Sequence, residues 1–386
     1  MPNKLRTQYN QQSLYVGPCP ATGKHYNDAS STNYVTGLYR IQSCNYSVNI
    51  SRTPVYQFGE QVAIDRPILE TPTVSLSANY LLANAWNEKM LGLVTDGKLP
   101  ALSGIVNRTQ DEKNWFLKIV NEGKDSVGDT TAVSEDVAVI GFGNGFLNSY
   151  STQASVGSFP TVDFSVSALN MVINTGISGR SPAINPANGL RVQNGPEYDY
   201  SLPTALSSPG AGDLDISVLR PGDITLTIKK RYAPDEGILS EATADYDTIG
   251  PDIDNANIQS YSLSFDLGRE PLQALGSRFA KTRFISFPVE VTCSIDALAA
   301  DLTTGAISDI IDNDHAYDIK INIVKPVPPG TAATRMMEYR LKNAKLNSQS
   351  YSNGIGDNKT VSLEFSASVG SASQSNVGLF ISGVTS

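Results

Sequence analysis

Side chains that could do catalytic or metal chemistry are few in this sequence, and the histidines are the first to consider. His25 and His315 each lie in a polar, loop-like stretch, and no second ligand stands at the spacing of a metal site. The three cysteines, Cys19, Cys44 and Cys293, are too few and too scattered for a disulfide framework or a zinc site. We therefore expect surface histidines, no bound metal and no cofactor.

Two short segments contain the residue types of ligand-binding loops. The stretch GFGNG (141–145) has the glycines of a phosphate loop, but FLNSYS follows it where a βαβ unit would place a helix. The stretch DIIDNDHAYD (309–318) clusters carboxylates but lacks the glycine and the terminal glutamate of an EF-hand. The first predicts a loop or bulge between strands, and the second predicts a solvated loop. No nucleophile motif accompanies them, so we expect no enzyme activity.

The size and charge of the chain limit its class. It has 386 residues, 40% of them hydrophobic, which leaves room for about two or three domains with packed cores. Its net charge of −9 argues against a protein that grips nucleic acid through the phosphates. The sequence shows neither a signal-like N-terminus nor a run of 18 apolar residues. We expect a protein that is made in a reducing cytoplasm and has no membrane span.

Apolar residues alternate with polar ones along most of the chain, which is the pattern of β-strands. The clearest runs lie at 162–166, 224–228 and 319–323, and turn residues separate them. Arg220-Pro221-Gly222-Asp223 predicts the turn of a hairpin near 213–232. Apolar residues recur at helical spacing over about residues 79–91, where we expect a helix. The predicted fold class is mainly β.

The sequence also aligns with itself. The stretch IQSCNYSVNISRTPVYQFGE (41–60) matches IQSYSLSFDLGREPLQALGS (258–277) with seven identities in twenty positions. The strand pattern of WFLKIV (115–120) recurs in IKINIV (319–324), and residues 144–168 align with 343–367. In that last block Leu147-Asn148-Ser149 meets Leu346-Asn347-Ser348. Three blocks in the same order favour an internal duplication over a chance alignment in a sequence rich in serine and asparagine.

The alignment preserves which residues point inward. Its matched apolar positions are Val162, Phe164 and Val166 in one block and Val361, Leu363 and Phe365 in the other. A slip of one residue would turn every side chain to the other face of its strand, so preserved parity supports the match. The duplication predicts an N-terminal arm (1–36), a first copy (37–174), a linker or insertion (175–252) and a second copy (253–386).

Two parts of this division are less patterned. The strand pair near 213–232 either completes the first copy or opens the second, and the sequence does not decide. Residues 1–36 are polar and poorly patterned, and we expect contact with neighbouring subunits to order them.

The segment YSVNISRTPVYQFGEQVAIDRPILETPTVSLSANYLLANAWNEKMLGL (46–93) resembles the tail tube, or major tail, proteins of tailed bacteriophages. The resemblance lies in a strand that runs into an arm, a returning strand with a proline, a Tyr-Leu-Leu motif and an Asn-Glu pair before Leu-Gly. The residues concerned are Arg52, Thr53, Phe58, Gly59, Val74, Leu76, Tyr80, Leu81, Leu82, Asn87, Glu88, Leu91 and Gly92. The second copy keeps Arg269, Pro271, Gly276, Pro288 and Val291, but it has Leu275 in place of Phe58 and lacks the Asn-Glu pair.

The resemblance implies two tandem tail-tube-like domains. Each would have two packed antiparallel sheets, forming a β-sandwich or half-barrel, with a flanking helix. It also implies that edge strands pair between subunits in rings, which the duplication would make trimeric and pseudo-sixfold, and that arms pack on the adjacent ring. The expected assembly-interface residues are Arg52, Thr53, Pro54, Tyr56, Phe58, Gly59, Arg66, Arg269, Pro271, Leu275, Gly276 and Arg283.

The resemblance also implies the location and partners of such a protein. It would be a structural component of the virion tail, made in the cytoplasm of a host bacterium. Its partners would be further copies of itself, tail proteins such as the tape measure, hub and terminator, and DNA that passes through the lumen without specific binding. Two alternatives remain open at this point: a baseplate-hub or tail-tip protein with the same duplicated domain, and a carbohydrate-binding β-sandwich module of a virion.

Overall fold

The described residues of the computed structural model are 8–19, 35–127, 137–186, 188–191, 199–203, 219–231, 258–276, 279–298, 316–325, 335–352 and 360–384. The mainly β expectation is confirmed, because fifteen strands form one hydrogen-bonded sheet and two further pairs form small sheets. All pairings in the large sheet are antiparallel, so each strand can bury one face and expose the other.

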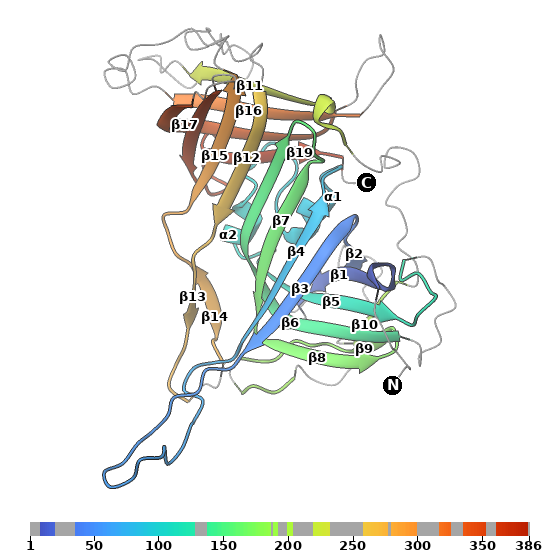
Figure 1. Cartoon of the computed structure of the whole chain (residues 1–386), viewed down its shortest axis with the longest axis vertical. Helices are drawn as coiled ribbons and strands as arrows, with labels where there is room; N and C mark the ends of the chain where they lie inside the picture. The colour runs from blue at the N-terminus through green and yellow to red at the C-terminus, as the bar shows by residue number, and fades with distance from the viewer. Residues whose placement is uncertain are drawn as a thin grey trace.

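The first half of the chain builds two layers from one path of strands (Figure 1). One layer has the order β3–β4–β7–β6. The long strand β6 runs on into the other layer, where it pairs with β5 and β8, while β5 pairs with β1 and β1 with β2. These strands are β1 (Gln12–Pro18), β2 (Thr36–Gly37), β3 (Ile41–Asn49), β4 (Thr73–Leu81), β5 (Glu112–Val120), β6 (Val137–Ser155), β7 (Thr161–Ala168) and β8 (Asn170–Thr175).

The second half repeats this order of pairing. One layer has the order β12–β15–β18–β17, and β17 runs on to pair with β16 and β19, while β16 pairs with β11. These strands are β11 (Ile224–Arg231), β12 (Ile258–Asp266), β15 (Glu290–Leu298), β16 (Ala316–Val324), β17 (Arg335–Ser352), β18 (Thr360–Ser368) and β19 (Gly378–Gly383). The two halves meet where β12 pairs with β6.

The registers of the two halves also coincide at residues that the sequence alignment matches. Ser43 faces Asn79, its counterpart Ser260 faces Asp296, and a register shift precedes each pair. A second shift follows Leu147 in β6, and another follows its counterpart Leu346 in β17. Each long strand therefore bends between its two layers at an equivalent place.

Asn144 and Asn343 mark a further irregularity that both long strands share. Both residues have positive φ, 53° and 59°, a conformation that asparagine tolerates better than most residues. The backbone N–H of Asn144 donates to Asn114 Oδ1, and that of Asn343 donates to Asp318 Oδ1, each at 3.0 Å. A side chain of the facing strand thus binds the backbone that the irregularity removes from regular pairing.

The GFGNG stretch lies within the continuous strand β6, so no loop interrupts it, but the expected bulge is present: a register shift against β5 leaves Gly143 and Asn144 opposite the single residue Asn114. Its glycines allow close approach of other chain segments. A Cβ atom on Gly143 would overlap the backbone of Pro182, and one on Gly145 would lie 2.7 Å from the Trp115 ring. The segment therefore needs small residues for packing, whereas a phosphate loop needs them to approach a ligand.

The helical content differs from the sequence expectation. The first helix, α1, covers only Trp86–Leu91, and α2 covers Ser103–Val106. Residues 79–81 continue β4, because pairing with β7 extends to Leu81 and supplies their backbone hydrogen bonds. α1 ends at Gly92, whose φ of 103° is the left-handed conformation of a helix C-terminus. None of the helices in the described part of the chain is long and apolar enough to cross a membrane.

Part of the N-terminal region differs from expectation, and the pairing of β11 decides a question that the sequence left open. Gln12–Pro18 forms β1, which is paired with β5 of the same chain and largely buried, so neighbouring subunits are not needed to order it. β11 pairs with β16 and thereby belongs to the second half, preceded by the 3-10 turn η5 (Pro221–Asp223). The other expected strand of that hairpin falls outside the described residues. Within 175–203, β9 (Ser178–Arg180) and β10 (Asp199–Ser201) form one of the small sheets.

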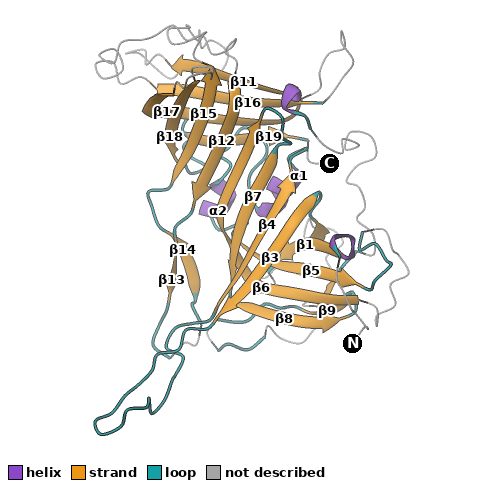
Figure 2. Cartoon of the chain, viewed as in Figure 1, coloured by secondary structure: helices purple, strands orange, loops and turns teal. Residues whose placement is uncertain are grey.

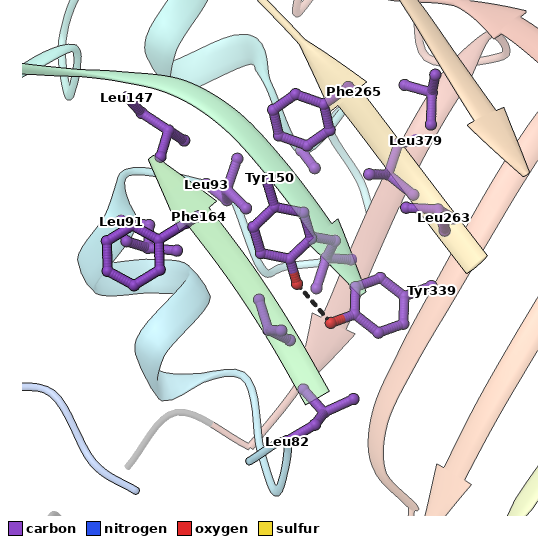
Figure 3. Close-up of a cluster of buried hydrophobic side chains, with 14 of the residues drawn as sticks. Leu82, Leu91, Leu93, Leu147, Tyr150, Phe164, Leu263, Phe265, Tyr339 and Leu379 are labelled. Atoms are coloured by element: carbon purple, nitrogen blue, oxygen red, sulfur yellow. Dashed lines mark hydrogen bonds between the residues drawn. The ribbon is translucent and has the colours of Figure 1, made fainter. Parts of the chain in front are cut away.

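A buried polar cluster joins the two halves, and Figure 3 shows its two central tyrosines, Tyr150 and Tyr339. Tyr150 of β6 and Tyr339 of β17 share a hydrogen bond of 2.6 Å between their hydroxyl oxygens. Glu88 of α1 lies beside them and accepts a hydrogen bond of 2.6 Å from the Tyr80 hydroxyl. All four side chains are almost inaccessible to solvent, and desolvation raises the pKa of Glu88 to about 7.

Candidate assembly surfaces

One face of the layer formed by β3, β4, β7, β6, β12, β15, β18 and the end of β17 is rich in serine. Side chains alternate along each strand, so the apolar residues point to the core and the polar ones form this serine face. It carries the carboxylates Asp163, Asp266, Glu290, Asp296 and Glu364. Segments 41–49, 73–81, 148–155, 161–168, 258–266, 290–298, 347–352 and 360–368 contain no lysine, arginine or histidine.

The serine face is hollowed and its side chains bind one another. A hollow of about 590 Å³ lies on it and extends from Ser43 in the first half to Thr292 in the second. Hydrogen bonds across strands recur in both halves: Ser47 with Ser75 at 2.7 Å, and the counterparts Ser264 with Thr292 at 3.0 Å. The surface is therefore polar, acidic and held in place by its own contacts.

The contact between the halves defines a complete strand interface within one chain. β12 pairs with β6 from Ser260 opposite Ser155 to Asp266 opposite Ser149. On the core side Phe265 lies beside Tyr150 (Figure 3), and the two rings stack with their centroids 5.4 Å apart. Leu263 and Phe265 are only 1% and 3% exposed. This pairing removes both edges from solvent and extends the core across the boundary.

The equivalent edges at the two ends of the chain have no partner strand among the described residues. β3, the counterpart of β12, pairs only with β4, and residues 347–352 of β17, the counterpart of the end of β6, pair only with β18. Tyr46 and Val48 correspond to Leu263 and Phe265 but are each 43% exposed. Tyr351 on β17 is 49% exposed. Both edges thus leave apolar core-side residues and backbone groups uncovered.

A long arm, residues 50–72, leaves the first half between β3 and β4 and projects beyond the rest of the chain (Figure 2). Its two sides are held by few contacts, among them a bridge between Val55 and Asp65 and a hydrogen bond of 3.2 Å from Arg52 Nη1 to the Arg66 carbonyl. Phe58 at the tip is fully exposed and precedes Gly59, whose φ is 92°. The other exposed apolar residues of this first arm are Ile50, Val55, Tyr56, Val62, Ile64, Ile68 and Leu69.

The corresponding second arm, residues 267–289, is a short hairpin of β13 (Arg269–Leu272) and β14 (Thr282–Ile285). It is bound to the first half. Arg269 makes an ion pair with Asp111, its Nε donates to the Leu147 carbonyl at 2.5 Å, and its guanidinium carbon lies 5.3 Å from the centroid of the Phe146 ring. The side chain of Arg269 is 1% exposed, so this contact is fully desolvated.

The expected interface residues therefore fall into two groups. Arg52, Thr53, Pro54, Tyr56, Phe58, Gly59 and Arg66 lie exposed on the first arm, and Pro271, Leu275 and Gly276 lie exposed on the second. Arg269 and Arg283 are instead at the base of the second arm, in contact with the first half or next to that contact. Within the chain the arms touch through Gln273, whose side-chain amide donates to Thr71 Oγ1 at 2.6 Å.

Sequence reasoning missed Asp111 and the exposed residues Tyr46, Val48 and Tyr351. The ion pair of Arg269 links residues far apart in the chain, and no local pattern marks it. The exposure of β3 depends on which strand lies beside it, and the sequence of β3 does not show that. Among the described residues no three His, Cys, Asp or Glu side chains gather as metal ligands, and His25 and His315 lie outside them.

Comparisons with known proteins return similarities of structure alone. No protein-family model and no curated protein sequence matches the chain. A chain of the SPP1 tail tube aligns over 44% of this chain and 80% of its own length, at 8% identity and a TM-score of 0.30. A chain of the anti-feeding prophage baseplate aligns over 45% and 97%, at 11% identity and a TM-score of 0.28. A chain of the virion of a gene transfer agent aligns over 44% and 100%, at 8% identity and a TM-score of 0.26.

Proposed function

We propose that this chain is a tail tube subunit of a virion, whose two halves are copies of one domain and which assembles head to tail into rings. The observation that carries the proposal is the difference between β12 and β3. Leu263 and Phe265 on β12 are buried against β6, whereas Tyr46 and Val48 at the matching positions of β3 are each 43% exposed. A second copy that supplies the end of its β17 would bury them as β6 buries β12.

The contact within the chain sets the register of the proposed contact between chains. Ser264 faces Ser151 in the β12–β6 pair. The matching residues are Ser47 on β3 and Ser350 on β17, so Ser47 of one chain would face Ser350 of the next, and Tyr46 would face Tyr351. This contact joins two different edges, and head-to-tail contacts of that kind close into rings when the rotation between subunits allows it. We propose that three chains close one ring with six similar halves.

The serine face supplies the proposed lumen. In a closed ring this hollowed face would point inward and continue from one chain to the next. Its carboxylates repel phosphates, and the strand segments that form it contain no lysine, arginine or histidine to hold them, so DNA would pass without sticking. The apolar first arm supports stacking, because a long exposed arm with an exposed Phe58 is suited to contact an adjacent ring.

A cysteine pair tests the ring directly. In the double variant Ser47→Cys with Ser350→Cys, mild oxidation or a short bis-thiol linker should join chains into covalent trimers on a denaturing gel. The native Cys44 should not compete, because burial raises the pKa of its thiol to about 12. The matched control pairs Ser43→Cys with Ser348→Cys, which the proposed register separates by about 20 Å.

The outcomes separate the proposal from its alternatives. Cross-linking of the first pair but not of the control, together with tubes in negative-stain micrographs, supports a tube subunit. Cross-linked trimers that never stack at any concentration would favour the baseplate-hub alternative. Absence of cross-linking, or equal cross-linking of the control pair, would contradict the ring.

A further inference from the structure

Arg269 shows how the base of an arm is bound to a neighbouring half. Its Nη1 donates to the Arg283 carbonyl within the arm at 3.3 Å, while its other donors reach Asp111 and the Leu147 carbonyl in the first half. The guanidinium also lies over Phe146. One desolvated side chain therefore fixes both the arm and the bend of β6 beside it.

Arg52 occupies the matching position in the first arm. It makes the matching contact within the arm, because its Nη1 donates to the carbonyl of Arg66, the counterpart of Arg283, at 3.2 Å. Its side chain is exposed, whereas that of Arg269 is buried. The arm contact is thus present in both halves, and the contact with a neighbouring half is present only in the second.

We infer that Arg52 binds the backbone carbonyl of Leu346 in the next chain of the ring, as Arg269 binds that of Leu147 within its own chain. Leu346 is the counterpart of Leu147, since each faces a core residue, Phe365 or Val166, just before the register shift of its long strand. The inference rests on the proposed ring and adds to it a positioning residue, a named acceptor atom and a direction of contact.

One residue difference between the halves makes the proposed Arg52 contact measurable. Lys345 stands where Phe146 stands in the first half, so the next chain would present a cation close to Arg52 instead of an aromatic ring. In the second arm the guanidinium carbon lies 5.3 Å from the ring centroid. At a similar separation two like charges would weaken the contact, and opposite charges would strengthen it. Lys345→Glu should therefore stabilise rings that contain Arg52 and should leave rings of the Arg52→Ala variant without that gain.

The experiment compares Arg52→Ala, Arg269→Ala, Lys345→Glu and the double variant Arg52→Ala with Lys345→Glu in the full chain. Ring dissociation on dilution and thermal unfolding of the isolated chain are the two readouts. Arg52→Ala should raise the ring dissociation constant about tenfold or more, which corresponds to the loss of a charge-assisted hydrogen bond at each contact. It should leave the unfolding midpoint unchanged, whereas Arg269→Ala should lower that midpoint. Lys345→Glu should lower the dissociation constant only when Arg52 is present.

The experiment separates failure of the proposed Arg52 contact from failure of the ring. If native rings form, and rings of the Arg52→Ala variant dissociate at the same concentration as native rings, Arg52 does not contribute to the contact although the ring exists. If Lys345→Glu acts equally with and without Arg52, the two side chains do not meet. If the native chain forms no rings and the Ser47–Ser350 cysteine pair does not cross-link, the proposed function itself fails.

Discussion

Tyr150 and Tyr339, one from each half of the chain, share a hydrogen bond of 2.6 Å beside the buried carboxyl group of Glu88. The Tyr150 hydroxyl also lies 3.2 Å from Glu88 Oε1, and that of Tyr80 lies 2.6 Å from it. Glu88 Oε2 is buried and has no hydrogen-bond partner among the described residues. Burial outweighs the tyrosine hydrogen bonds, so the pKa of Glu88 rises to about 7.

The first prediction concerns pH. The folded chain keeps a proton on Glu88 up to about pH 7, whereas the unfolded chain loses it near the ordinary pKa of 4.5. The unfolding free energy should therefore fall as pH rises through this window, by up to about 3 kcal/mol. Glu88→Gln removes the titrating group and should make the isolated chain more stable than the native chain at pH 8.

Urea unfolding at pH 5 and pH 8 measures the effect, and Glu60→Gln on the exposed first arm is the control. If the stability of native and Glu88→Gln chains changes equally with pH, Glu88 is not the group responsible.

The second prediction concerns the tyrosine pair. Tyr339→Phe removes one hydroxyl and leaves Tyr150 without that partner in a buried site. We expect the unfolding free energy of the isolated chain to fall by about 1–2 kcal/mol. Tyr56→Phe, which removes an exposed hydroxyl from the first arm, should change it little. Equal stability of the two variants would show that the hydrogen bond between the halves contributes nothing to folding.

Alternation along single strands was enough to predict the mainly β class and many core positions. Val162, Phe164 and Val166 are all buried, because residues two apart on a strand share a face. The predicted start of the helix was wrong, because the local pattern did not decide the structure there. Leu81 lies in a segment with helical spacing, but pairing with β7 holds it in a strand, and that partner lies far away in the sequence. Local pattern and tertiary pairing conflicted there, and pairing prevailed.

The candidate surfaces were only partly visible in the sequence. The arms were predicted because Arg52 and Arg269 recur at the same distance after a strand in each half. Their different environments could not be predicted, because burial of Arg269 depends on Asp111, which is 158 residues away. In the same way, β3 and β12 have similar sequences, and only the fold determines that one edge is covered and the other is not.

The third prediction tests close packing in β6. A Cβ atom on Gly143 would overlap the Pro182 backbone, so Gly143→Ala should cost about 2 kcal/mol or more of unfolding free energy. Gly222→Ala is the matched control, since a Cβ there would meet nothing within 4 Å. Thermal or urea unfolding measures both. A native-like stability of Gly143→Ala would mean that the segment around Pro182 can move away freely.

The fourth prediction separates assembly from folding at matching positions. Val48→Lys places a charge on an exposed position, so the isolated chain should unfold within about 0.5 kcal/mol of the native chain. Rings should be lost, because the charge would be buried without a partner in the proposed contact. Phe265→Lys places the same charge in the core between the halves and should prevent folding. Ring formation by Val48→Lys at native concentrations would rule out β3 as the assembly edge.

The last prediction concerns the first arm. Deletion of residues 53–60 removes one side of the arm with Phe58 but keeps Arg52 and every residue of β3 and β4. Rings should therefore persist, as judged by cross-linking of the Ser47–Ser350 cysteine pair, while tubes disappear from negative-stain micrographs.

The milder Phe58→Ser keeps the arm but removes a large apolar side chain that is fully exposed in the isolated chain. It should shorten the tubes or raise the concentration needed to form them, because apolar surface buried between rings drives stacking. Tubes of native length from the deletion variant would show that the arm is a surface hairpin without a role in stacking.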